Sequence, residues 1–104
     1  MAWVLLLAAG LLEIVWAFTM KLSQGFTRPG ASVVTLLTML VSFGLLSISM
    51  KSLPLGTAYA VWTGIGAAGT AILGMVLLGE PPTAWRLTSL SLILLGVAGL
   101  KLAR

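Results

Sequence analysis

The chain of 104 residues is 60% hydrophobic and only 8% charged, and it contains neither cysteine nor histidine. This composition excludes an ordinary soluble domain and is typical of a polytopic membrane protein. Without histidine, cysteine or clustered acids, a dedicated metal site has no ligands, and we expect neither a metal nor a cofactor. The net charge of +4 does not indicate a nucleic-acid partner, because the six cations are scattered near the ends of the apolar stretches: Lys21, Arg28, Lys51, Arg86, Lys101 and Arg104.

Four apolar stretches are each long enough to cross a hydrocarbon core of about 30 Å. Lipid cannot satisfy open backbone groups, so these stretches must be helices. They cover approximately 2–20, 31–50, 57–78 and 87–102. We therefore predict an all-α integral membrane protein with four transmembrane helices, built as a single membrane domain over residues 1–104.

Glu13 is the only charged residue in the first stretch, and it lies close to the centre of that stretch. At about 1.5 Å per residue, Glu13 is roughly 3 Å from the bilayer midplane. A carboxylate at this depth costs several kcal/mol, so an intramembrane acid is by default a functional candidate. A structural role would need a cation on a neighbouring helix, and the sequence offers no Lys or Arg at matching depth. We predict that Glu13 carries the function.

The second stretch carries a stripe of hydroxyl side chains. The spacing of three, four and seven residues places them on one helical face: Thr35, Thr38, Ser42 and Ser49. In lipid such a stripe should face protein or water, and Ser42 lies near mid-depth. Alternatively, each hydroxyl bonds back to a carbonyl of its own helix.

The third stretch opens with an aromatic pair, Tyr59 and Trp62, which share a face that Gly66 continues. The alternative for both is the interfacial aromatic belt. Tyr59 lies roughly 12 Å from the centre of the span and Trp62 roughly 8 Å. A position in the interfacial belt is therefore a stronger alternative for Tyr59 than for Trp62. Paired glycines are places where a helix can bend, which makes Gly64 and Gly66 candidates for that role.

The last part of the chain has little evident chemistry. Glu80, the only other acid, lies in the loop before the fourth stretch, and we expect it to be solvated and without a special role. In the fourth stretch, Ser89 and Gly96 lie seven residues apart. A seam of small residues predicts a helix–helix contact, here between subunits.

The loop charges favour neither orientation in the membrane. One side carries three cations (Lys51, Lys101 and Arg104), and the other side carries three as well (Lys21, Arg28 and Arg86). Four helices with one acid enclose a poor pathway, whereas a dimer doubles the helices and brings two Glu13 side chains together. A chain inserted both ways would form an antiparallel dimer with inverted symmetry. Trp16 and Trp62 lie on opposite sides of the depth of Glu13, so aromatic layers from both subunits would flank the two acids.

At such a site a proton and a cation compete for the same negative charge. If the dimer alternates its opening, this competition couples proton uptake to cation release. Aromatic rings nearby suit a cationic or planar ligand through cation–π contact and stacking. The hydroxyl of Ser42 could orient the acid or accept N–H groups of the ligand.

Several segments resemble the small multidrug resistance family, and the similarity runs nearly end to end. They are Glu13 with Trp16, the Gly-Phe-Thr-Arg segment at 25–28 and, above all, the Lys-Ser-Leu-Pro-Leu-Gly-Thr-Ala-Tyr-Ala-Val-Trp-Thr-Gly-Ile-Gly-Ala segment at 51–67. Trp16, the Trp-Thr-Gly-Ile-Gly run at 62–66 and the Gly-Leu-Lys at 99–101 resemble the guanidinium-exporter branch.

This resemblance implies an antiparallel, dual-topology homodimer in the bacterial cytoplasmic (inner) membrane that exports guanidinium in exchange for protons. Glu13 would be the shared proton and substrate site. The pocket would be lined by Gly10, Trp16, Ser42, Tyr59 and Trp62.

Other functions remain open at this point. Guanidinium is planar, stays charged at physiological pH and can donate to a carboxylate in bidentate fashion. A multidrug exporter of quaternary ammonium or other bulky hydrophobic cations would need a wider and less polar portal. A non-transporting membrane subunit, whose Glu13 pairs with a cation of its partner, is a more distant alternative, because balanced loop charges argue against a fixed partner. We expect no enzyme, since no nucleophile–base pair or cofactor motif is present.

Overall fold

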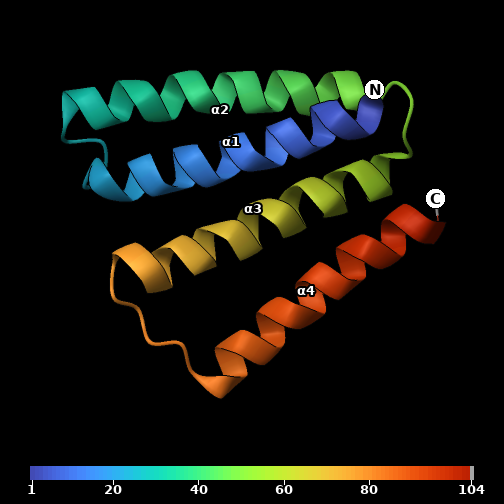
Figure 1. The fold of residues 1–104 in the computed structure, drawn as a ribbon. Coiled ribbons are helices and arrows are strands. Elements are labelled where there is room, and N and C mark those ends of the chain that lie inside the picture. Colours follow the sequence, from blue (N-terminus) through green and yellow to red (C-terminus); the bar gives the residue numbers. More distant parts are fainter. Residues whose placement is uncertain (104) are drawn as a thin grey trace.

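The computed structural model describes residues 1–103 as four helices joined by short loops (Figure 1). Arg104, one of the cations counted above, lies outside the described residues. The helices are α1 (Ala2–Leu22), α2 (Pro29–Ser49), α3 (Leu55–Leu77) and α4 (Ala84–Ala103). All four are long and apolar enough to cross a membrane. The prediction of an all-α chain with four spans is confirmed.

The helices begin earlier than the hydropathy pattern suggested for α2, α3 and α4. α2 begins at Pro29, because proline at the first helical position loses no intrahelical hydrogen bond. At α4 the hydroxyl of Thr83 accepts a hydrogen bond from the backbone N–H of Arg86, at 3.2 Å. This cap places Trp85 and Arg86 in the first turn of the helix, ahead of the apolar stretch at 87–102 from which the helix was predicted.

The four helices lie side by side in a single flat layer with extents of 40 × 34 × 16 Å (Figure 1). α1 packs against both α2 and α3, and α4 packs against α3 alone. No described residue of α4 is buried, and both Ser89 and Gly96 are exposed. The seam that was predicted between subunits is therefore open in the single chain, and its contact with a second copy stays a prediction.

The hydroxyl stripe of α2 faces α1. Thr35, Ser42 and Ser49 are fully buried. The hydroxyls of Thr35 and Thr19 lie 2.7 Å apart, and Ser42 donates to the carbonyl oxygen of Ala9 at 2.7 Å. Thr35 also bonds back to its own helix, at the carbonyl of residue 31. Both interpretations of the stripe therefore hold, because the hydroxyls join α2 to α1 and also satisfy carbonyls within α2.

The loop after α3 turns back over the helix that it leaves. Gly79 has a φ of 72°, a left-handed conformation that costs glycine little. The backbone N–H of Glu80 can then donate to the carbonyl oxygen of Gly74, at 3.1 Å. This turn brings Glu80 back against the last turns of α3, instead of leaving it in the open loop.

Candidate functional site

Glu13 lies next to the midpoint of α1, and its carboxyl group packs directly against Gly66 of α3. A Cβ atom at position 66 would overlap with this carboxyl group. The Oε1 atom of Glu13 is buried and has no hydrogen-bond partner among residues 1–103. Within the same residues the only ion pair joins Arg86 to Glu80, so no protein cation neutralises Glu13. A carboxyl group with a buried, unpaired oxygen is available to a proton or to a cation from outside.

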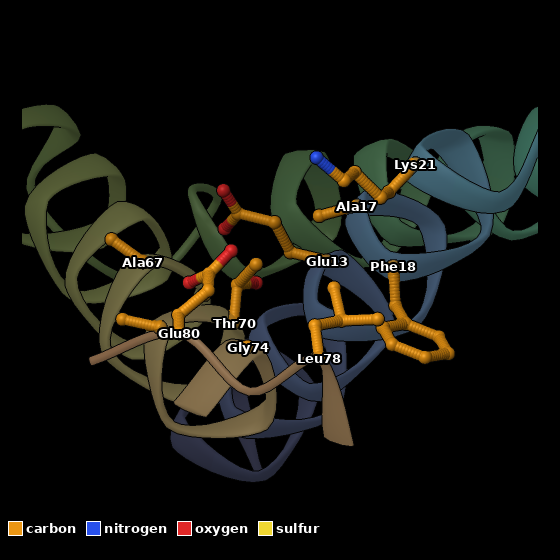
Figure 2. Close-up of a pocket in the computed structure, with 11 residues that line it drawn as sticks. Glu13, Ala17, Phe18, Lys21, Ala67, Thr70, Gly74, Leu78 and Glu80 are labelled. Carbon is orange, nitrogen blue, oxygen red and sulfur yellow. The ribbon is translucent and has the colours of Figure 1, made fainter. Parts of the chain in front are cut away.

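A cavity of about 420 Å³ lies between α1 and α3 beside Glu13 (Figure 2). This volume falls within the range of about 300–1,000 Å³ that is usual for small-molecule sites. Two lines of residues, each spaced by four, form its walls. They are Glu13, Ala17 and Lys21 on α1, and Gly66, Thr70 and Gly74 on α3. Four of these six side chains are no larger than threonine. Because they are small, they leave space between α1 and α3.

Thr70 supplies the second unpaired polar atom of this cavity. Its Oγ1 atom is buried and has no hydrogen-bond partner in the described chain. Thr38 and Ser91, by contrast, bond back to carbonyls one turn earlier in their helices. An unpaired hydroxyl and an unpaired carboxyl oxygen in one cavity together favour a ligand that donates hydrogen bonds or carries positive charge.

Glu80 also lines the cavity, so this residue is only partly solvated, and the expectation that it has no special role stays a prediction. Its carboxylate lies over Gly74, where a Cβ atom would overlap with it, and accepts a hydrogen bond from Arg86 at 3.2 Å. The Glu80 side chain is 39% exposed. The hydropathy pattern cannot predict that Glu80 lies at the cavity, because this placement depends on the left-handed turn at Gly79. The Gly-Glu pair that ends the third apolar stretch is the one feature that could have suggested it.

The predicted aromatic residues form a cluster that joins α1, α2 and α3. The ring centroids of Tyr59 and Trp62 lie 5.6 Å apart, those of Trp62 and Phe43 lie 5.6 Å apart, and those of Phe43 and Trp16 lie 6.2 Å apart. Trp62 is only 7% exposed, whereas Tyr59 is 55% exposed. Phe43, which links the two tryptophans, was not predicted, although it stands beside Ser42 in the sequence.

Ser42 holds this cluster to α1. Its hydroxyl donates to the carbonyl of Ala9 and accepts a hydrogen bond from Nε1 of Trp62 at 3.0 Å. A serine oxygen has two lone pairs, one of which accepts this bond, and the Ser42 side chain is fully buried. In the described chain no hydrogen bond joins Glu13 to Ser42, Trp62 or any other side chain.

The remaining predicted residues are accounted for by packing. Gly10 lies against Ile65, and Gly64 lies against Val97 of α4. α3 is one continuous helix, so both Gly64 and Gly66 serve close approach of helices here, and their role in bending stays a prediction. The 420 Å³ cavity contains Glu13 but none of the five predicted lining residues: Gly10, Trp16, Ser42, Tyr59 and Trp62. The role of these five residues in a pocket stays a prediction.

The described residues hold no group of three or more His, Cys, Asp or Glu side chains that could bind a metal ion. The site therefore consists of one unpaired carboxyl group, one unpaired hydroxyl group and a second, ion-paired carboxylate at the loop end. Four membrane-spanning helices with an unpaired acid at mid-depth define a multi-pass membrane protein with an intramembrane ionisable site.

Residues 1–93 match the family described as Small Multidrug Resistance protein, and the chain belongs to this family. The chain is 61% identical to a protein of Yersinia pseudotuberculosis serotype I (strain IP32953) named Guanidinium exporter, over 99% of both chains. It is 59% identical to the Guanidinium exporter of Escherichia coli (strain K12), over 99% of this chain and 98% of the relative. It is 56% identical to the Guanidinium exporter of Proteus vulgaris, over 99% of both chains. The resemblance seen in the sequence is confirmed, and the protein is a membrane transporter.

Proposed function

We propose that this protein exports guanidinium and small guanidinyl cations across the cytoplasmic membrane of a bacterium in exchange for protons. The observation that carries the proposal is the Glu13 carboxyl group, which lies beside a cavity at mid-span and has one buried oxygen without a partner in the described chain. The names of relatives about 60% identical over 99% of the chain point to the same cation.

The chemistry of guanidinium suits this site. Its planar fork of N–H groups can donate two hydrogen bonds to one carboxylate. It remains charged at any physiological pH, so a protein that moves it must offer a negative charge within the membrane. Glu13 offers that charge when it is deprotonated and withdraws it when it binds a proton. Because the two ligands exclude each other, each proton that arrives favours release of the cation.

We infer that the working unit is an antiparallel homodimer of chains inserted in both orientations. The single chain is a layer only 16 Å thick, and α4 buries none of its described residues, so one copy cannot enclose a route for a cation. The equal loop charges favour neither orientation. In such a dimer two Glu13 side chains would face each other, and alternating opening of the two ends would expose the pair to each side in turn.

Solid-supported-membrane electrophysiology on proteoliposomes tests this proposal. We expect guanidinium to evoke currents that vanish in Glu13→Gln, because glutamine keeps the shape of the side chain but neither takes up a proton nor carries a charge. The matched control is Ser47→Ala, an exposed position on α2, which should keep wild-type currents.

Strong Glu13-dependent currents from a bulky tetraalkylammonium ion would replace the selective exporter with a multidrug exporter. A folded, dimeric protein that gives no Glu13-dependent current with either cation would support a non-transporting subunit instead. Cross-linking of single-cysteine variants that finds only parallel neighbours would exclude the antiparallel dimer.

A further inference from the structure

The cavity beside Glu13 does not end at mid-membrane. Its walls follow α1 and α3 for nine residues each, from Glu13 to Lys21 and from Gly66 to Gly74, which corresponds to roughly 12 Å of helix. At the far end it reaches Leu78 and Glu80, in the loop that follows α3. The cavity therefore joins the buried acid to the end of the helical layer where this loop lies.

Three polar groups stand along one face of this passage. The Glu13 carboxyl group lies over Gly66, the Glu80 carboxylate lies over Gly74, and Thr70 stands midway between these two glycines. In Figure 2 both carboxyl groups and the Thr70 side chain lie toward the same space between the helices. Because positions 66, 70 and 74 recur at intervals of four, they share one face of α3.

Carboxyl groups outnumber cations among the residues that line the cavity, although Arg86, outside the lining, forms an ion pair with one of them. Glu13 and Glu80 contribute two carboxyl groups, against one ammonium group from Lys21, whose side chain extends toward the cavity in Figure 2. Arg86 pairs with Glu80 through one carboxylate oxygen, Oε1. The other oxygen, Oε2, is free to accept a further hydrogen bond, since a carboxylate can bind two donors at once.

We propose that the Glu80 carboxylate is the outer binding site for the cationic substrate, at the loop end of this cavity. Thr70 then binds the cation as an intermediate site between Glu80 and Glu13. The cation first pairs with Glu80 at the membrane surface, then donates an N–H group to the unpaired hydroxyl of Thr70, and finally binds Glu13. No bond is made or broken in these steps. The proposal rests on the proposed export of guanidinium-type cations and assigns its outer binding step to named residues.

Paired variants separate this role from a structural one. Glu80→Gln and Arg86→Gln both remove the same ion pair, but only Glu80→Gln removes the negative charge. In proteoliposomes we expect Glu80→Gln to raise the KM for guanidinium about fivefold, with little change in maximal current. The difference in KM between Glu80→Gln and the wild type should become smaller at high salt, because salt screens the attraction between Glu80 and the cation. Arg86→Gln should leave the KM within about twofold of wild type or lower it. Equal increases in both variants, or no increase in Glu80→Gln, would overturn the proposal.

Thr70 gives an independent test, which still decides the matter if Glu80→Gln does not fold. Thr70→Val keeps the shape and removes the hydroxyl, whereas Thr70→Ser keeps the hydroxyl. We expect Thr70→Val to raise the KM for guanidinium about tenfold and Thr70→Ser to stay near wild type. Equal behaviour of the two variants would overturn the role of Thr70. These outcomes can be distinguished from an outcome that contradicts the proposed export. If the protein does not export guanidinium, the wild-type protein itself gives no Glu13-dependent current.

Discussion

The two sides of α1 differ in how their polar groups are satisfied. On the side of α2, Ser42 is fully buried and its hydroxyl both donates and accepts a hydrogen bond within the protein. On the side of α3, Glu13 and Thr70 each have a buried oxygen atom without a partner in the described chain. Both sides pack apolar helices around polar residues at similar depth. The unpaired oxygen atoms lie on the side of α3, whereas the aromatic cluster beside α2 leaves one donor, Nε1 of Trp16, buried without a partner in the described chain.

This difference separates residues that hold the helices together from residues that bind a ligand. A hydrogen bond between helices removes the penalty of burying a hydroxyl group and fixes the spacing of α1 and α2. An unpaired carboxyl group in a cavity does the opposite, because its burial is unfavourable until a proton or a cation arrives. We therefore expect substitutions on the α2 side to change stability first, and substitutions on the α3 side to change transport first.

Gly66→Ala should have the largest effect on transport. The added methyl group would overlap with the Glu13 carboxyl group and force it out of its position against α3. Because a small misplacement of a reacting group is costly, we expect guanidinium transport to fall by about 100-fold, measured as peak current in proteoliposomes. The control is Gly44→Ala on α2, where a Cβ atom meets open space. Normal transport by a folded Gly66→Ala variant would show that the observed position of Glu13 is not the working one.

Ser42→Ala tests the opposite side of α1. The substitution removes the bond to the Ala9 carbonyl and leaves Nε1 of Trp62 without its partner. We expect the free energy of unfolding to fall by about 2 kcal/mol, measured by denaturant titration in detergent micelles, because a buried donor is left unsatisfied. Ser47→Ala, on the exposed face of the same helix, is the matched control. A stable Ser42→Ala protein whose transport is lost would place Ser42 in the substrate pocket instead.

The pH dependence of transport gives the smallest of the three effects. A proton and guanidinium compete for Glu13, so acidification should raise the KM for guanidinium, and alkalinisation should lower it until the carboxylate is fully deprotonated. Competition by one proton changes the KM by at most about tenfold per pH unit. Currents measured at several guanidinium concentrations and pH values check this. A KM that does not change with pH, together with currents that still require Glu13, would contradict direct competition.

The sequence by itself determined the number of spans, because each helix is encoded by a local run of apolar residues whose length must match the bilayer. It also singled out Glu13 as the candidate site residue, because one acid at mid-depth stands out against an apolar background, and that role stays a prediction. Three of the four hydroxyls of the stripe on α2 followed from helical periodicity, since Thr35, Ser42 and Ser49 are all fully buried. Thr38, the fourth, is partly exposed and bonds back to its own helix.

Only the tertiary structure decided what these residues contact. That Glu13 packs against Gly66 depends on the register between α1 and α3, and helical periodicity within one segment does not specify the register between two. That Glu80 returns to the Glu13 cavity depends on the left-handed turn at Gly79. That Thr70 lacks a partner, while Ser42 has two, depends on which side chains the neighbouring helices happen to present. Periodicity and hydropathy are properties of single segments, whereas the site is made between segments.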